Sequence, residues 1–362
     1  MRVSRRPRTL GTTGIPMMHR NQGHAMTTSQ QQLPEGARYC ADTFNGAIAS
    51  AALSAAWEIG LLDELDQRRR LDIAEFAEQR DAHPHTVRAI LIALSSRRIV
   101  SLDPERETAE TDVGFDDAFR ARAFFYWLTR GCGELLTTLP VKVVNSLRQG
   151  GFVRRDARAI SVACRNITQT FFDPPLRDMI DSLELGTVAD LGCGGGERLL
   201  MLAALKPEAR LIGVDMSTSA ITVAREAVRE AGVQDRVTLT QDDFVTMGPR
   251  PEYAKVDTVT CFLMGHDLWP RQDCVRTLRR LRTVFPNVRN LILGDTCRST
   301  GLDGPEHPLF TLGFETVHSV MGQLLPTIDE WSTAIEEGGW RIADRHLLDV
   351  PAFSFIDRLT PA

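Results

Sequence analysis

The fold of this chain is decided by the segment Val188-Ala189-Asp190-Leu191-Gly192-Cys193-Gly194-Gly195-Gly196-Glu197. Its apolar first half predicts a buried strand, and its glycines predict a tight turn that leads into a helix near Glu197. Glycines at such a turn let the backbone approach a ligand closely. The loop reads Asp-x-Gly-x-Gly rather than the Gly-x-Gly-x-x-Gly of dinucleotide enzymes, so it offers little for a pyrophosphate. An acid that opens the loop suits a cationic ligand instead.

Short β-rich runs alternate with helical segments from this point onward. The runs are Thr187–Leu191, Leu211–Asp215, Val237–Thr240, Val256–Phe262 and Leu291–Asp295. We therefore predict an α/β domain whose parallel, doubly wound, Rossmann-like sheet carries helices on both faces. In such a sheet, ligands bind outside the carboxyl ends of the strands.

The residues that follow the second and third runs suit a nucleoside. Asp215 ends the second run, where a carboxylate can accept hydrogen bonds from both ribose hydroxyls. The third run is followed by Gln241-Asp242-Asp243-Phe244, which we expect to contact an adenine amino group and to stack on its ring. With the glycine loop, this spacing resembles the class I S-adenosylmethionine-dependent methyltransferases, with Asp190 beside the methionine moiety. The alternatives are a nicotinamide enzyme or an inert Rossmann-like domain. The expected cofactor-binding residues are Asp190, Gly192, Gly194, Asp215, Met216, Asp242, Asp243 and Phe244.

Two histidines are candidates for the chemistry. His266 follows the fourth run, in Cys261-Phe262-Leu263-Met264-Gly265-His266-Asp267-Leu268-Trp269-Pro270. We expect it to face the transferred methyl group, as a general base or a metal ligand. The alternative is a structural histidine that caps the next helix. His318 follows the fifth run and shares a helical face with Phe314 and Met321. Taken alone, His318 fits a buried structural histidine.

The region before residue 115 is predicted to be helical with a small hairpin. Apolar residues from Ile48 to Leu62 fall at helical spacing, and a short helix over 71–77 follows. A break at His83-Pro84, a second helix and a hairpin over 99–111 complete a winged-helix pattern. Between Leu71 and Arg98, four basic residues balance four acidic ones, which lacks the positive face that DNA binding needs. We therefore predict a dimerisation platform, and the alternative is a DNA-binding regulator that senses S-adenosylmethionine.

The composition excludes several other classes of protein. The 362 residues include 42 Lys+Arg and 47 Asp+Glu, a formal charge of −5, which argues against a nucleic-acid partner. Seven cysteines without a C-x-x-C pair indicate neither a disulfide framework nor a zinc–thiolate site, and they fit a cytoplasmic protein. No run reaches the ~20 apolar residues of a membrane span. The arginine-rich start lacks the apolar core of a secretory signal, so we expect a disordered leader. Met17, Met18 and Met26 are alternative translation starts.

The chain as a whole resembles the dimeric small-molecule O-methyltransferases in the order of its helices, winged helix and catalytic domain. Their general base is the histidine of a His-Asp-Trp-like motif, whereas this chain reads His266-Asp267-Leu268-Trp269. A longer resemblance, from Thr43 to about Leu348, is to phenylpyruvate and related 2-oxoacid C-methyltransferases of bacterial peptide-antibiotic pathways. It is carried by the segments Cys261–Asp295, Phe310–Gly322, Trp127–Glu134 and Phe152–Ala157.

This second resemblance implies a site and a reaction. In that family two histidines, here His266 and His318, hold a non-haem metal cation, and the 2-oxoacid chelates it. Iron and zinc both accept such donors. Cys132 stands where the family has a serine. The residues that correspond to the family's substrate contacts are Trp127, Arg155, Leu263 and Asp267.

We therefore expect a homodimer that methylates the β-carbon of a 2-oxoacid, of the phenylpyruvate or branched-chain type, and so supplies a β-methyl amino acid precursor. The alternative is an O-methyltransferase that uses His266 as its base without a metal. The expected parts are a leader over 1–36, a winged-helix dimerisation domain over 37–115, connecting helices over 116–185 that contribute to the substrate pocket, and a Rossmann-like catalytic domain over 186–362.

Overall fold

The computed structural model describes residues 34–148, 155–302, 304 and 306–362. It divides into two compact units, one that ends at Phe44 and one that spans Asn45–Ala362. Most of the predicted leader lies outside the described residues. Helix α1 (Glu35–Glu58) begins within the last two residues of that predicted leader. Among the described residues, no helix combines the length and apolar character that a bilayer crossing requires.

The winged helix is confirmed, with two differences from the prediction. The helix expected to run through Leu62 is broken at Gly60, which adopts a left-handed φ of 77° and separates α1 from α2 (Leu61–Arg68). A short strand that the sequence did not reveal, β1 (Arg70–Asp72), joins the hairpin in a three-stranded sheet of order β1-β3-β2. The remaining elements are α3 (Ile73–Gln79), α4 (Pro84–Ser95), β2 (Val100–Asp103) and β3 (Thr108–Thr111).

Local sequence explains where these helices begin. Asp72 caps α3 by accepting a hydrogen bond from the backbone N–H of Glu75 at 2.9 Å. Pro84 occupies the first turn of α4, where its missing N–H costs nothing. Leu53, Leu62, Leu91 and Phe115 contribute to a buried core that belongs to this part of the chain.

The connecting segment is helical, as predicted, and it contains two π-helical turns. Such turns are rare and concentrate at functional sites. The elements are α5 (Phe115–Tyr126), the π-turn η1 (Trp127–Gly131), α6 (Gly133–Thr137), α7 (Leu139–Lys142), η2 (Asn145–Leu147), α8 (Ala157–Ile167), the π-turn η3 (Thr168–Phe172) and α9 (Asp173–Asp181).

The catalytic part is built on a seven-stranded sheet of order β6-β5-β4-β7-β8-β10-β9. The five predicted runs are its five parallel strands. Two further strands, which the sequence did not predict, complete the sheet, and β10 pairs antiparallel with both β8 and β9. The strands are β4 (Thr187–Leu191), β5 (Arg210–Asp215), β6 (Val237–Gln241), β7 (Thr258–Phe262), β8 (Asn290–Thr296), β9 (Trp340–Leu348) and β10 (Ser354–Pro361).

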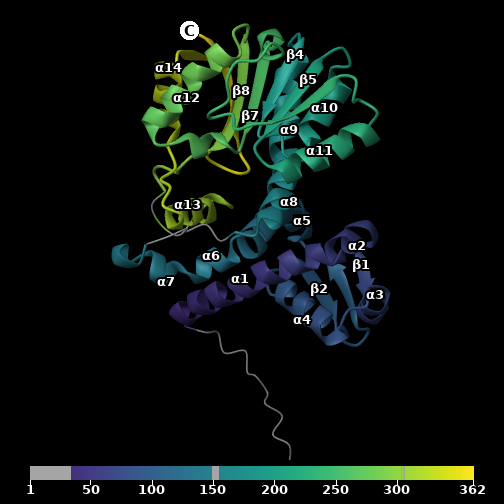
Figure 1. Cartoon of the computed structure of the whole chain (residues 1–362). Helices are drawn as coiled ribbons and strands as arrows, with labels where there is room; N and C mark the ends of the chain where they lie inside the picture. Colours follow the sequence, from purple (N-terminus) through teal and green to yellow (C-terminus); the bar gives the residue numbers. More distant parts are fainter. Residues whose placement is uncertain (1–33, 149–154, 303, 305) are drawn as a thin grey trace, which may run out of the picture. The chain divides into compact units, whose positions relative to one another are not determined.

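Each face of this sheet packs into a separate core, and alternation along the strands assigns residues to the two faces. Along β8, Leu291 and Leu293 enter one core and Ile292 enters the other. Figure 1 shows α12 and α14 together at one side of the strands and α10 and α11 at the other. The elements that follow β4 in sequence are α10 (Glu197–Leu205), α11 (Thr218–Glu230), η4 (Tyr253–Lys255), η5 (Gly265–Leu268), α12 (Arg271–Val284), α13 (Thr311–Val320) and α14 (Ile328–Glu337).

Candidate active site

The glycine loop after β4 adopts the conformation that its sequence predicts. Gly192, Gly194 and Gly196 all have left-handed φ angles, of 70°, 53° and 88°, which strain any residue with a Cβ. Asp215 stabilises the loop, because its Oδ2 accepts a hydrogen bond from the Gly194 N–H at 2.9 Å. Its Oδ1 accepts one from the Ser217 N–H at 2.8 Å. The carboxylate therefore joins the turns that follow β4 and β5, at the sheet edge where a ligand is expected.

The other predicted cofactor-binding residues follow β5 and β6, and the Asp242 N–H donates to the Asp215 carbonyl at 3.0 Å. Asp242 forms an ion pair with Arg250 at 2.6 Å, and Asp243 accepts a hydrogen bond from the Val245 N–H at 2.9 Å. Met216 is 69% exposed, whereas Phe244 packs into the core beneath the sheet. None of these predicted contacts lines the main cavity described below.

Asp190 was expected beside the ligand, but it lies behind the cavity wall rather than on it. It is fully buried, accepts a hydrogen bond from Thr260 Oγ1 at 2.6 Å, and lies 3.7 Å from Arg198 Nη1. Arg198 also lies 3.7 Å from Asp173 and stacks over the Phe262 ring at 3.8 Å. Burial raises the pKa of Asp190 and of Asp173, while Arg198 opposes that shift in both. Arg198 and Asp173, neither singled out from the sequence, line the cavity in place of Asp190.

A cavity of about 310 Å³ opens at the carboxyl ends of β4 and β7. Its wall comes from the glycine loop, the turn after β7, α8, both π-turns and α13. The structure brings most of the predicted substrate and metal residues together here, with part of the predicted cofactor site. The predicted residues that line it are Trp127, Arg155, Gly192, Gly194, Asp215, Leu263, His266, Asp267 and His318.

His266 and His318 face each other in this cavity, with ring centroids 4.9 Å apart and ring planes at 86°. His266 is buried, and its Nδ1 lies 2.7 Å from Asp295 Oδ1. The other Asp295 oxygen accepts a hydrogen bond from the His266 backbone N–H at 2.7 Å. Burial lowers the pKa of His266, but the Asp295 carboxylate outweighs it, so the pKa is raised overall. Asp295 therefore fixes the imidazole and directs its Nε2 toward the cavity.

His318 is also buried, and its surroundings keep it neutral. Its Nδ1 donates to the backbone oxygen of Phe314 at 2.7 Å, so the lone pair is on Nε2. Burial, and then the charge of His266, lower the pKa of His318 to about 3. Both rings thus have Nδ1 occupied and Nε2 available, the arrangement found in metal-binding histidines.

Aromatic side chains and Arg155 complete the part of the cavity around the two histidines. The Trp127 ring lies 5.2 Å from that of Phe310 and 6.4 Å from that of His318. The Phe314 ring lies 4.1 Å from that of His318. Arg155 also lines the cavity, and its positive charge works against protonation of both histidines.

Sequence reasoning missed several residues of this site besides Arg198 and Asp173. Asp295 ends a strand that was predicted, so its position at the carboxyl end of β8 was the available signal. Phe310 and Phe314 fall within a segment that carried the resemblance to the C-methyltransferases. The part of that resemblance that falls on Phe152–Arg154 lies outside the described residues.

Comparison with known proteins supports this picture. A family model described as a methyltransferase domain matches residues 188–286, and an O-methyltransferase dimerisation domain matches residues 41–124. The methyltransferase ungE' of Aspergillus campestris is 39% identical over 333 residues, which cover 89% of this chain and 96% of that protein. The indolepyruvate C-methyltransferase of Streptomyces griseus is 30% identical over 296 residues, which cover 77% of this chain and 82% of that protein.

The fold is also that of solved methyltransferases. The structure of human N-acetylserotonin methyltransferase in complex with S-adenosylmethionine matches with a TM-score of 0.64 at 17% identity, over 92% of this chain and 99% of that chain. The glycine loop, the Asp215 carboxylate and the full-length relatives agree on one assignment. The chain belongs to the S-adenosylmethionine-dependent class I methyltransferases that carry an O-methyltransferase dimerisation domain.

Proposed function

We propose that this methyltransferase transfers the methyl group of S-adenosylmethionine to the β-carbon of a 2-oxoacid, with a metal cation held by His266 and His318. The observation that carries the proposal is the pair of buried imidazoles, 4.9 Å apart, in a cavity that the glycine loop also lines. The similarity to an indolepyruvate C-methyltransferase supports the same reaction.

The two histidines fit a metal by the chemistry of their donors. Each ring has Nδ1 occupied, by Asp295 in one case and by the Phe314 carbonyl in the other, and presents Nε2. Over the described ranges, no group of three or more His, Cys, Asp or Glu side chains is arranged to hold a metal. The chain would thus supply two nitrogen ligands and leave the other positions to substrate oxygens, as iron and zinc both allow. A cation held by these two residues would act as a Lewis acid toward the ketone oxygen of the 2-oxoacid and would make its β-proton more acidic.

The chain's own residues bind and orient the acceptor. The planar guanidinium of Arg155 suits the substrate carboxylate. Trp127, Phe310 and Phe314 provide an aromatic wall for the substrate side chain. A proton passes from the β-carbon of the acceptor to a base, with solvent water as its final acceptor, and the electron pair left behind forms the new C–C bond to the sulfonium methyl group. The C–S bond breaks with its electron pair on sulfur, which yields S-adenosylhomocysteine.

One observation favours a second function, O-methylation without a metal. The hydrogen bond between His266 Nδ1 and Asp295, at 2.7 Å, is also the arrangement of a general base held by a carboxylate. In that case His266 would deprotonate a substrate hydroxyl and His318 would serve only as part of the wall.

Alanine substitutions at the two histidines separate these functions. For C-methylation we expect His266→Ala and His318→Ala to lose bound metal together and to stop turnover of phenylpyruvate and indolepyruvate. Binding of S-adenosylmethionine should survive in both. His346→Ala, on an exposed position of β9, is the matched control and should resemble wild type. Elemental analysis gives the metal content, and proton NMR locates the new methyl group.

The alternative predicts a different pattern. O-methylation requires that His266→Ala be inactive, His318→Ala be nearly normal and chelators have no effect. A metal-free wild-type enzyme that methylates a hydroxyl group would overturn the proposal. Carbon-methylated product from metal-free His318→Ala would contradict the metal-assisted mechanism alone.

A further inference from the structure

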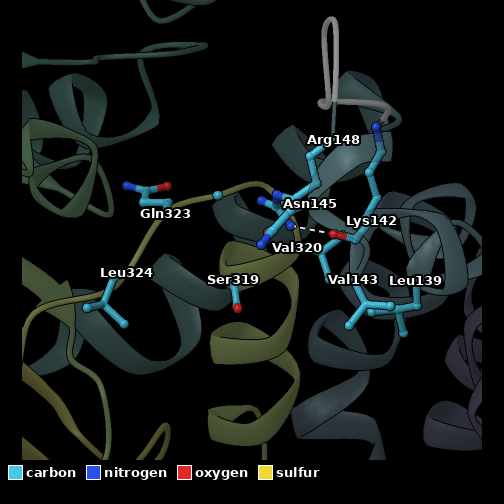
Figure 2. A pocket seen from close by; sticks show the side chains of 10 residues that line it. Leu139, Lys142, Val143, Asn145, Arg148, Ser319, Val320, Gln323 and Leu324 are labelled. Carbon is cyan, nitrogen blue, oxygen red and sulfur yellow. Dashed lines mark hydrogen bonds between the residues drawn. The ribbon is translucent and has the colours of Figure 1, made fainter.

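Gln323 lies in the turn that follows α13, and its side chain is hydrogen-bonded to residues of the active-site cavity. On one side is a separate cavity of about 400 Å³ whose wall includes α7 and the end of α13. Figure 2 shows this cavity from close by, and the Gln323 side chain points away from Lys142 and Val143. The side chain instead reaches the turn that carries His266, on the side of the active-site cavity.

Gln323 connects the two histidine-bearing elements through three hydrogen bonds. Its backbone N–H donates to the His318 carbonyl at 2.9 Å. Its side-chain Nε2 donates to the His266 carbonyl at 2.6 Å and to Asp267 Oδ1 at 3.2 Å. His266 and Asp267, the two partners of the side chain, lie on η5, 57 and 56 positions before Gln323 in the sequence. The two hydrogen bonds therefore link η5 directly to the turn after α13.

The chemistry of an amide suits this position. A glutamine NH2 group has two protons, and here each has an acceptor of its own. A glutamate would have the same shape but only acceptor oxygens at neutral pH, and it would place a second negative charge beside Asp267. A leucine would fill similar space and donate nothing. The side chain therefore orients both η5 residues without adding charge to the cavity.

We infer that Gln323 is a positioning residue, which sets the placement of His266 relative to His318 and directs the Asp267 carboxylate along the cavity edge. This inference rests on the proposed function in so far as the two histidines act together on the acceptor. A displacement of about 1 Å in such a group can cost on the order of a hundredfold in rate. The effect of Gln323 should therefore appear in turnover rather than in cofactor binding.

Two substitutions of similar size test the inference in the full-length enzyme. We expect kcat for the 2-oxoacid to fall by about tenfold or more in Gln323→Leu and further in Gln323→Glu. Affinity for S-adenosylmethionine, by calorimetry, should stay within about twofold of wild type, because Gln323 contacts neither the glycine loop nor Asp215. Leu324→Ala changes the adjacent residue, which is 72% exposed, and should leave both quantities unchanged.

Two results decide the outcome: the order of kcat among the variants, and whether kcat falls while affinity for S-adenosylmethionine stays unchanged. If Gln323→Glu turns over as fast as wild type, the inference is wrong. It is also wrong if both variants lose cofactor affinity and thermal stability in proportion to kcat, since a purely structural role predicts that result. Titration with Fe²⁺ and with Zn²⁺ adds a readout without turnover, because displaced histidines should weaken metal binding at least severalfold. If the wild-type enzyme instead binds no metal and methylates a hydroxyl group, the proposed function fails. The role of Gln323 is still tested in that case, because kcat for the hydroxyl substrate should fall from wild type to Gln323→Leu and further to Gln323→Glu.

Discussion

At the scale of single residues, Asp215 holds the glycine loop, and we expect it to bind the cofactor as well. Its two oxygens hold the turns after β4 and β5, and the same carboxylate is expected to accept the ribose hydroxyls. We predict that Asp215→Ala weakens S-adenosylmethionine binding by about 1.5–3 kcal/mol, the value of hydrogen bonds to a charged group. Calorimetry on the folded variant measures this, with Asp235→Ala, an exposed position, as control. Wild-type affinity in the variant would contradict the assignment.

The position of Arg198 leads to a prediction about the free energy of unfolding. Its guanidinium lies between two buried carboxylates, those of Asp173 and Asp190. Arg198→Met would leave both without their countercharge, which costs about 3–5 kcal/mol in buried ion pairs. Urea unfolding should show that loss, whereas Arg225→Met, on the exposed side of α11, should change the free energy of unfolding by less than about 0.5 kcal/mol. Equal stability of the two variants would show that Arg198 is dispensable to the core.

At the scale of elements, α14 begins with a capping box that makes its stability depend on pH. Thr327 Oγ1 accepts from the Glu330 N–H at 3.2 Å, and Glu330 Oε2 accepts from the Thr327 N–H at 2.7 Å. That backbone hydrogen bond, with Arg298 nearby, lowers the pKa of Glu330 below its usual 4.5. Because the folded-state pKa is depressed, the stabilisation is complete above pH 4.5 and is lost as the pH falls through the folded-state pKa.

We therefore expect Glu330→Gln to reduce the free energy of unfolding at pH 7 by about 0.5 kcal/mol, since the carboxylate is partly solvent-screened. The difference from wild type should shrink as the pH is lowered below 4.5. Urea unfolding followed by circular dichroism at both pH values measures it, with Glu336→Gln on the exposed face of α14 as control. A difference that grows on acidification would contradict this role of Glu330.

The elements also show what sequence could and could not reveal. The five parallel strands were predictable because their runs are apolar and end in turn residues, and His266 was found because it follows one of them. Strand β9 was not predicted because polar residues at exposed positions, Arg341, Asp344 and His346, interrupt its apolar pattern. Strand β10 contains Asp357, and from sequence alone an aspartate predicts a surface position. In the structure Asp357 is buried, and Arg345 donates two hydrogen bonds of 2.7 Å to it. Asp295 likewise acquires its role only through a tertiary contact.

At the scale of the whole molecule, the dimerisation domain leads to a test of assembly. Ile48 lies in the region that matches the dimerisation domain and is 52% exposed in the single chain, so its side chain is accessible to a partner subunit. We propose a homodimer and predict that Ile48→Lys shifts it toward monomer. Light scattering measures the shift, and Val223→Lys, at a 55% exposed position of α11, is the control. An unchanged dimer in Ile48→Lys would place the interface elsewhere.

A second test at this scale concerns the arginine-rich start of the chain. Residues 1–25 lie outside the described residues, and their composition offers little apolar surface to bury. We predict that their removal leaves kcat and S-adenosylmethionine affinity unchanged. A soluble truncated enzyme with reduced turnover would show that this segment takes part in function.

The place of β10 in the sheet has a consequence for how the protein is synthesised. This strand is the last of the sheet to be translated, yet it lies between β8 and β9 and pairs with both. A nascent chain on the ribosome therefore has an open gap beside β8 until residues 354–361 emerge. Phe355 pairs with Asp295, the residue that holds His266. We therefore expect the support of His266 by Asp295 to be complete only after β10 joins the sheet, and a chain that stops before residue 354 to be inactive.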